Sequence, residues 1–298
     1  QECTMSDSVS QQDADQVDAG LFRRGGGRRD PPPPLEPPTG GNPAPKLAEY
    51  QMNHPKRGLC LIFNQVTFDP RTGQSTRIGS DVDADNLERS FKQLGFSIMP
   101  FRDLSCEKIV SVIKETARKD HSNYDCVAVV LLSHGENGAI YGSDGKIKME
   151  KLFRLLRPDY CPTLAGKPKL FFIQACRGSE YDKGCEVADG DNGTGRDEED
   201  GGKLSRIPLE SDFLYFYSTP PGYYSWRNDI QGSWFIQQLC HVLQRYGDSD
   251  ELGHLLLMVQ QAVAGNYQSN TNDDSTSGMK EIPVSVSTLR KLVYFRRK

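Results

Sequence analysis

A thiol and an imidazole stand at the ends of two apolar runs in this chain of 298 residues. Cys176 lies in the pentapeptide Gln-Ala-Cys-Arg-Gly, which follows the run at residues 169–173. His134 lies in a Ser-His-Gly turn 42 residues before Cys176, after the run at residues 126–132. A free thiol is mostly protonated at neutral pH, and a nearby imidazole can take its proton. Alone, each residue would be interpreted as structural, but together they are the two parts that a cysteine nucleophile needs.

The segments that must position this pair alternate between strand and helix patterns. Continuous apolar runs, typical of buried parallel strands, occupy residues 59–63, 126–132, 169–173 and 213–217. Further strand patterns cover residues 96–101 and 284–295. Helical spacing appears at residues 87–94, after the capping residue Ser105, and at residues 234–243 and 252–263.

This alternation predicts an α/β fold, a three-layer sandwich in which helices cover both faces of a mostly parallel central sheet of about six strands. In such folds, ligands bind beyond the carboxyl ends of the strands. His134 and Cys176 both follow the ends of predicted strands. The pattern and the chemistry therefore indicate the same edge of the sheet.

Composition limits the kind of protein. Glycine, proline and acidic residues are concentrated in residues 1–50 and 180–203, which have few apolar side chains to bury. The formal net charge of -4 gives no reason to expect a nucleic-acid-binding protein. The run at residues 126–132 is too short to span a bilayer, and no signal-peptide core appears near the start. The lack of a longer apolar run predicts no membrane partner, and eight cysteines without a C-x-x-C pair indicate a reduced, cytoplasmic chain.

Four motifs together resemble the caspase family, of the executioner type, over about residues 50–298. They are the pentapeptide around Cys176, the Ser-His-Gly turn, the segment that contains Arg77, and the Tyr-Tyr-Ser-Trp-Arg-Asn segment at residues 223–228. The resemblance implies a caspase-like fold and a thiol protease, a hydrolase that cleaves after aspartate during apoptosis. It also implies a zymogen that is activated by cleavage, with autocatalytic cuts, and no metal or other cofactor.

The resemblance assigns roles to residues of the reaction centre. Cys176 would be the nucleophile, His134 the acid/base, and the backbone N–H groups of Gly135 and Cys176 would stabilise the oxyanion. Arg77, Gln174 and Arg227 would surround the side chain of the substrate aspartate. Two guanidinium groups can bind one carboxylate through bidentate bonds, and such a pocket rejects uncharged residues.

The resemblance also assigns the outer pockets. The remaining substrate-binding candidates are Tyr224, Ser225, Trp226, Asn228 and Trp234. Tyr224 and Trp226 would form the walls of the next pocket, Asn228 would bind an aspartate four residues before the cut, and Trp234 would line that outer pocket. Some relatives carry phenylalanines where this chain has Asn270, Asn272 and Thr276. The outer pocket is therefore expected to be more polar and less selective.

The composition and the resemblance together predict four segments. Residues 1–50 would be a disordered leader that is cut after Asp18, and residues 51–189 would be the large catalytic subunit. Residues 190–203 would be a cleavable linker, with cuts after Asp189 and later after Asp200, and residues 204–298 the small subunit. Two such heterodimers would form a homodimer through the last strand, where Val284 replaces a cysteine common in relatives.

Expected partners are protein substrates with exposed Asp-x-x-Asp sites, an upstream initiator protease and inhibitor-of-apoptosis proteins. Residues 23–29 carry four arginines among glycines and are a candidate docking segment for acidic proteins or RNA. Two other functions stay open at this point. A non-catalytic caspase-like partner would lack part of the machinery, which is intact here. A Cys-His hydrolase that prefers basic residues would need acids in its primary pocket, where this chain has arginines.

Overall fold

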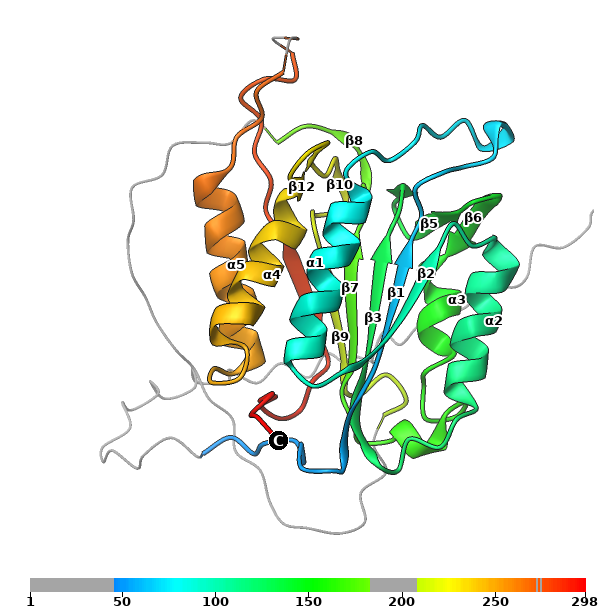
Figure 1. Ribbon diagram of the computed structural model, residues 1–298, viewed down its shortest axis with the longest axis vertical. Helices are drawn as coiled ribbons and strands as arrows, with labels where there is room; N and C mark the ends of the chain where they lie inside the picture. Colours follow the sequence, from blue (N-terminus) through cyan, green and yellow to red (C-terminus); the bar gives the residue numbers. More distant parts are fainter. Residues whose placement is uncertain (1–45, 183–207, 272, 274) are drawn as a thin grey trace, which may run out of the picture. The chain divides into compact units, whose positions relative to one another are not determined.

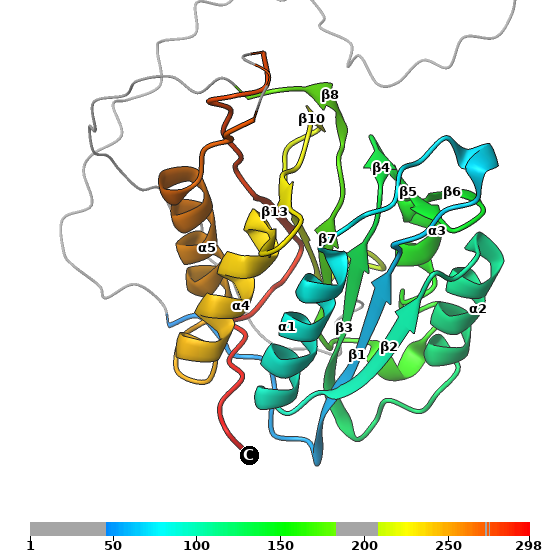
Figure 2. The ribbon, with the colours of Figure 1, turned by 45° about the horizontal axis from the view of Figure 1, so that its top comes forward.

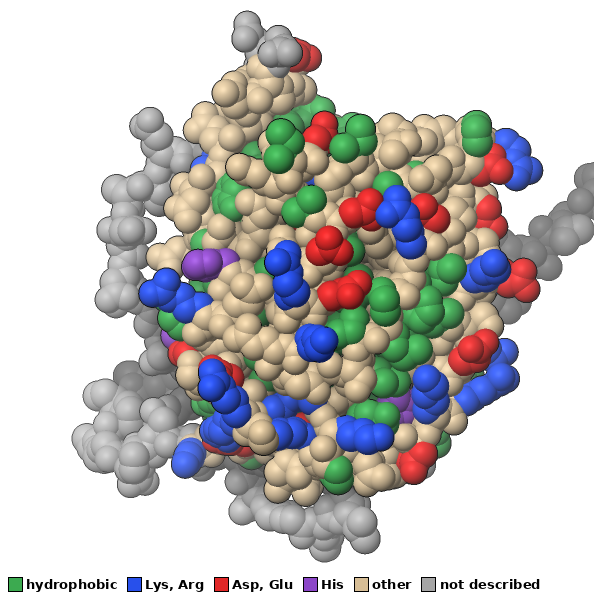
Figure 3. All heavy atoms as spheres, in the orientation of Figure 1, with side chains coloured by type: hydrophobic (Ala, Val, Ile, Leu, Met, Phe, Trp, Pro, Cys, Tyr) green, Lys and Arg blue, Asp and Glu red, His purple; other side chains and the backbone are tan. Residues whose placement is uncertain are grey.

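The computed structural model describes residues 46–182, 208–271, 273 and 275–298. Several predictions concern residues outside these ranges: the leader with its arginine segment and Asp18, the linker with Asp189 and Asp200, and Asn272. In the part of the chain that is described, no helix is long and apolar enough to cross a bilayer. Acidic and basic side chains are interspersed over the face of the molecule shown in Figure 3.

A six-stranded sheet forms the centre of the fold (Figure 1). In spatial order its strands are β13 (Val284–Ser287), β9 (Phe213–Tyr217), β7 (Lys169–Gln174), β3 (Tyr124–Leu132), β1 (Lys56–Asn64) and β2 (Ser97–Arg102). All neighbours pair in parallel except β13, which runs antiparallel to β9. The predicted sheet, mostly parallel with about six strands, is confirmed.

Helices cover both faces of this sheet (Figure 1). One face carries α1 (Ser80–Gln93), α4 (Trp234–Tyr246) and α5 (Leu252–Asn266), and the other carries α2 (Cys106–Ala117) and α3 (Met149–Arg154). Successive strand residues point to opposite faces, so the buried strands supply both layers. Cys60 and Ile62 of β1 join the core under α1, α4 and α5, whereas Leu61 and Phe63 join the core under α2 and α3. The predicted three-layer arrangement is therefore confirmed.

Local sequence signals explain several element boundaries. Ser105 caps α2 as predicted, because its side chain accepts a hydrogen bond from the N–H of Lys108. The predicted apolar stripe of α5 is buried. Two short 3₁₀ helices, η1 (Pro70–Thr72) and η2 (Pro162–Leu164), begin at prolines, where a missing N–H costs nothing.

The prediction of a strand over residues 284–295 is wrong beyond Ser287. β13 runs antiparallel to β9, and the pair Ser287 with Leu214 lies next to the first residue of β9. Thr288 still bonds the backbone next to this pair, since its N–H donates to the carbonyl of Phe213 at 2.8 Å and its carbonyl accepts from the N–H of Asp212 at 2.9 Å. The chain leaves the sheet and buries Val293 and Phe295 in the core instead.

Short strands lie at the end of the sheet where the parallel strands finish (Figure 2). A three-stranded sheet contains β4 (Gly135–Glu136), β5 (Ala139–Gly142) and β6 (Gly145–Lys148). Two two-stranded pairs join β8 (Gly178–Glu180) to β10 (Gly222–Tyr223) and β11 (Arg227–Asn228) to β12 (Gly232–Ser233). β4 follows β3, and β8 follows β7, so these additions surround the predicted reaction centre.

Candidate active site

The thiol and the imidazole come from adjacent strands. β3 and β7 pair in parallel with Leu132 opposite Gln174, and the N–H of Ser133 bonds the carbonyl of Gln174 at 3.1 Å. Cys176 and His134 therefore both emerge at the same edge of the sheet, as predicted. Gly135 packs directly on this backbone, since a Cβ at this position would lie 2.8 Å from the carbonyl oxygen of Cys176. Only glycine allows so close an approach.

His134 is oriented by a backbone carbonyl. Its Nε2 lies 2.8 Å from the carbonyl oxygen of Ser75, and its ring packs 5.0 Å from the ring of Phe68. A carbonyl can only accept, so Nε2 carries the proton, and Nδ1 is left as the basic nitrogen of the neutral ring. Burial, together with Arg77 and Arg227, lowers the pKa of His134, although the bond to Ser75 opposes this shift.

Cys176 is half-buried, and its Sγ lies 4.0 Å from the carbonyl oxygen of Ser225. Burial raises the pKa of this thiol, against the smaller opposing effects of the Ser225 bond and the two pocket arginines. The pKa of the thiol is thus raised while the pKa of His134 is lowered. Both shifts favour a neutral thiol and a neutral imidazole over a thiolate with an imidazolium.

Arg77 and Arg227 form a cationic pocket next to the thiol. Arg77 is buried, and its Nη1 donates to the carbonyl of Gln65 at 3.0 Å and to Ser80 Oγ at 2.6 Å. Arg227 Nε donates to the carbonyl of Ile78 at 2.8 Å. Burial and the neighbouring Arg227 lower the pKa of Arg77 to about 9.

Neither pocket arginine has a carboxylate partner among the described residues. No acidic side chain in this part of the chain lies within ion-pair distance of either guanidinium group. The charge of Asp83 raises the pKa of both arginines from a distance, but the carboxylate oxygens of Asp83 accept hydrogen bonds from the N–H and hydroxyl of Ser233. Two partly desolvated cations without a counter-ion favour the binding of an external carboxylate.

Gln174 and Ser225 belong to a hydrogen-bonded chain behind this pocket. Gln174 Nε2 donates to Ser225 Oγ at 2.7 Å, and Ser225 Oγ donates to Oε2 of Glu281 at 3.3 Å. The N–H of Trp226 also donates to Oε2 of Glu281. The sequence analysis missed Glu281; the available signal was an acid directly before an apolar, proline-containing segment.

Aromatic rings continue outward from the pocket as a stack. Trp226 stacks on Trp234 with ring centroids 5.6 Å apart, and Trp234 stacks on Tyr267 at 5.3 Å. Tyr224 stacks on Tyr181 at 4.6 Å. The predicted residues Tyr224, Trp226 and Trp234 are thus brought together, whereas Tyr181 and Tyr267 were missed because isolated tyrosines carry no motif.

The polar side chains of the outer pocket have defined local partners. Asn228 Oδ1 accepts from the N–H groups of Ile230 and Gln231 at 2.9 Å each, which leaves its amide NH₂ for a ligand. The carbonyl of Thr276 accepts from Ser269 Oγ at 2.7 Å, and Asn270 is exposed. Neither Asn270 nor Thr276 adds an apolar surface to the stack of rings.

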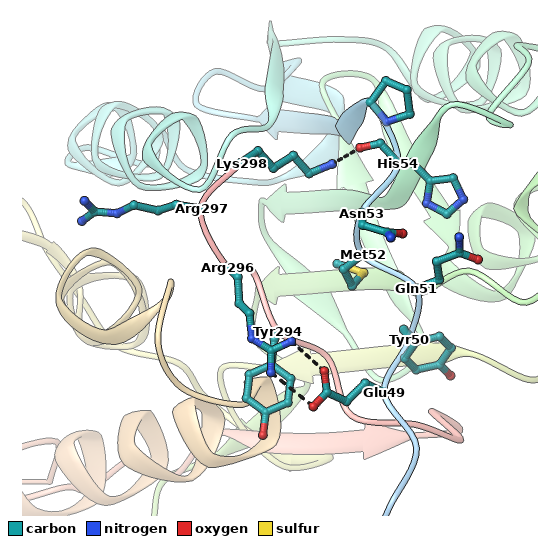
Figure 4. A pocket seen from close by; sticks show the side chains of 11 residues that line it. Glu49, Tyr50, Gln51, Met52, Asn53, His54, Tyr294, Arg296, Arg297 and Lys298 are labelled. Atoms are coloured by element: carbon teal, nitrogen blue, oxygen red, sulfur yellow. Dashed lines mark hydrogen bonds and ion pairs between the residues drawn. The ribbon is translucent and has the colours of Figure 1, made fainter.

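A separate cleft lies at the opposite end of β1 (Figure 4). It is lined by residues 49–55, 294 and 296–298, and none of the predicted site residues lines it. Arg296 pairs with Glu49 at 2.6 Å, and Lys298 donates to the carbonyl of His54. This cleft is therefore distinct from the reaction centre.

Comparison with known proteins decides the family. The model of the caspase domain matches residues 57–294. The chain belongs to the caspase family. It is 48% identical to caspase-7 of Gallus gallus over 249 residues, which cover 83% of this chain and 80% of the relative. It is 47% identical to caspase-3 of Felis catus over 246 residues, 83% of this chain and 86% of that relative.

A solved structure supports the same fold. The crystal structure of caspase-1 from Spodoptera frugiperda matches with a TM-score of 0.77 at 41% identity, covering 84% of this chain and 94% of that one. This caspase is therefore a cysteine endopeptidase that cleaves after aspartate in apoptosis and is made as a zymogen. The interpretation as a hydrolase that prefers basic residues is wrong.

The neutral pair favoured in this caspase makes a prediction about alkylation. Because the pKa of Cys176 is raised, little thiolate exists at neutral pH, and the rate of reaction with iodoacetamide should climb steadily from pH 6 to above pH 8.5, the usual thiol range. The rate is measured by mass spectrometry of the Cys176 peptide. A plateau below pH 7 would instead reveal a thiolate and imidazolium pair.

Proposed function

We propose that Cys176 is the nucleophile of this caspase, that His134 is its acid/base, and that Arg77, Gln174 and Arg227 recognise the aspartate of the substrate. The observation that carries this proposal is the pair of partly desolvated guanidinium groups, without a described carboxylate partner, beside the thiol. A substrate carboxylate would supply the missing negative charge. Its main chain would then extend past the thiol.

The reaction follows from these positions. Sγ of Cys176 attacks the carbonyl carbon of the aspartate while Nδ1 of His134 takes the thiol proton. The carbonyl oxygen becomes an oxyanion that accepts from the N–H groups of Gly135 and Cys176. The C–N bond then breaks, and the imidazolium gives its proton to the leaving amine. Water hydrolyses the resulting thioester and restores the thiol.

Peptides that differ only at the residue before the cut test the proposed recognition. Because asparagine has nearly the shape of aspartate but no charge, it leaves both guanidinium groups without a counter-ion. We expect kcat/KM for the asparagine peptide to be about 10⁴-fold lower, as for other sites that lose a required polar partner. A difference smaller than tenfold, or equal cleavage after lysine, would contradict the proposal.

The stacked aromatic rings are proposed to bind the substrate residues that lie farther from the cut. We propose that Tyr224 and Trp226 form the walls of the pocket next to the primary one. The amide NH₂ of Asn228 binds an aspartate four residues before the cut, beside Trp234, which gives an Asp-x-x-Asp preference. The polar residues Asn270 and Thr276 make this outer preference weaker than the primary one. Ser225 contributes through its bond to Gln174.

Activation by cleavage is proposed to act through the residues that follow Cys176 and lead into the linker. The carbonyl of Glu180 accepts from the N–H of Tyr224 at 2.9 Å, and the N–H of Lys280 donates to the carbonyl of Asp182 at 2.8 Å. The segment that leads into the linker therefore holds the pocket loop directly. We propose that cuts after Asp189 and Asp200, with the first made by an upstream initiator protease, release this constraint.

A linker that cannot be cut tests this activation. The triple variant Asp189→Ala, Asp191→Ala and Asp200→Ala also removes Asp191, a less favoured aspartate between the two proposed cut sites. It should remain a single chain and lose about 100-fold of its peptidase activity, as expected if the active arrangement falls to about one part in a hundred. Activity is measured on a short peptide, and the intact chain is verified by mass spectrometry. Full activity of the uncut variant would reject the model, and Asp120→Ala on the described surface serves as the control.

The remaining proposals concern assembly and location. β13 pairs with β9 on one side, and Val286 on this strand is 48% exposed. An open edge of this kind favours pairing with a second copy, so we propose a homodimer of large and small subunits that meet along β13. The leader would be removed after Asp18. A cytoplasmic location and binding by inhibitor-of-apoptosis proteins complete the proposal.

A further inference from the structure

Glu281 is a buried acid behind the reaction centre, and the proposed reaction does not use it directly. Glu281 is 2% exposed, and it lies three positions before the start of β13. Burying a carboxyl group is costly unless its oxygens find donors or it keeps its proton. Its contacts therefore bear on how the neighbouring loop is held.

The carboxyl of Glu281 is connected to the proposed machinery through one loop residue. Oε2 accepts from the N–H of Trp226 and from Ser225 Oγ at 3.3 Å. Ser225 Oγ in turn accepts from Gln174 Nε2 at 2.7 Å, and the Ser225 carbonyl lies 4.0 Å from Sγ of Cys176. Glu281 thus binds Ser225 and Trp226, the loop residues that connect it to the Cys176 thiol and to Gln174.

No described cation compensates a charge at this position. Oε1 of Glu281 is buried and has no hydrogen-bond partner within the described part of the chain. The adjacent Lys280 donates its ammonium group to the carbonyl of Tyr267. The charge of Asp83 on α1 acts on Glu281, and the charge of Glu281 acts on Cys176, on which the charges of Arg77 and Arg227 also act. Burial raises the pKa of Glu281 to about 8.

We propose that Glu281, in its protonated form, is a positioning residue that holds Ser225 and Trp226 against Gln174 and keeps the surroundings of the Cys176 thiol free of negative charge. This inference rests on the proposed roles of Cys176 and Gln174. When Glu281 loses its proton, an uncompensated negative charge appears beside the reacting sulfur. That charge opposes both the developing thiolate and the oxyanion, so catalysis declines on the alkaline side.

The isosteric variant Glu281→Gln separates charge from shape. Glutamine keeps an acceptor oxygen for the Trp226 N–H but cannot ionise. In the cleaved wild-type enzyme, kcat/KM should fall about tenfold per pH unit above about pH 8, as for loss of one required proton. Glu281→Gln should retain at least about a third of the activity at pH 7 and lack this alkaline decline. Glu281→Ala should lose more than about tenfold at every pH.

Two controls make the result decisive. Glu107→Gln changes an exposed acid on α2, at the other face of the sheet, and should keep the wild-type profile. The two tryptophans of the chain, Trp226 and Trp234, report the loop without turnover. Their fluorescence in a Cys176→Ala background should titrate near pH 8, and this transition should vanish when Glu281→Gln is added.

The outcomes distinguish this inference from the proposed function. An unchanged alkaline decline in Glu281→Gln, or a fluorescence transition that persists in that variant, would overturn the positioning role of Glu281. If Cys176→Ala itself kept its activity, the proposed nucleophile would be wrong instead. A silent Cys176→Ala together with a wild-type profile for Glu281→Gln would reject this inference alone.

Discussion

Cys176→Ala is expected to lower kcat/KM for an aspartyl peptide by at least about 10⁴-fold, because the remaining pocket can bind the substrate but cannot form the thioester. The fold should persist, since the side chain of Cys176 is half-buried and belongs to neither hydrophobic core. Activity is measured on the cleaved enzyme, and circular dichroism compares the fold with that of the wild type.

A matched cysteine provides the control for this result. Cys106, at the start of α2, is also half-buried, and it lies outside the pocket. Cys106→Ala should therefore keep wild-type turnover. If Cys176→Ala retained a tenth of the activity, the assignment of the nucleophile would be wrong.

Removing either pocket arginine should have the second-largest effect. Arg77→Ala and Arg227→Ala each leave a bound aspartate with one cation, and breaking a desolvated charge pair costs about 2–5 kcal/mol, or roughly 30-fold to several thousand-fold in kcat/KM. Lysine keeps the charge but loses the bidentate geometry, so Arg227→Lys should recover only part of this loss. The measurement is the ratio of kcat/KM for aspartate and asparagine peptides.

This ratio also protects the test against loss of folding. Arg77 is buried and bonds Gln65 and Ser80, so its removal can lower the amount of folded protein. Both peptides are cleaved by the same folded fraction, and their ratio reports recognition alone. Arg118→Ala, at the exposed end of α2, should leave the ratio unchanged. A wild-type ratio in both pocket variants would remove these arginines from the recognition of aspartate.

Buried strands were predictable from the sequence because their apolar runs must lie inside an α/β sheet. β1, β3, β7 and β9 all include the predicted runs, extended by zero to four residues. The last strand was predicted too long, since Val293 and Phe295 are as apolar as strand residues. Their burial depends on packing into a core built from distant elements, which the local pattern does not reveal.

Some candidate site residues could likewise be predicted from the sequence, whereas others were visible only in the structure. Cys176, His134 and Gly135 were identifiable from the chain because their motifs follow two strands, and parallel pairing brings the ends of such strands together. Ser75 was not identifiable, because it acts through a backbone carbonyl that every residue possesses, 59 positions from His134. The pocket arginines stand out in the motifs, but whether a described carboxylate lies near them depends on residues distant in sequence.

The sequence by itself determined the chemistry available to this protein: a thiol, an imidazole and two guanidinium groups carried by strand ends and loops of an α/β fold. Tertiary structure alone decided the directions in which the pKa values of these groups shift and the residues that support them. Burial raises the pKa of Cys176, lowers the pKa of His134 and raises the pKa of Glu281 to about 8. Desolvation and hydrogen bonding depend on everything packed around a group, and for Glu281 and Trp226 the contact spans 55 positions of the chain.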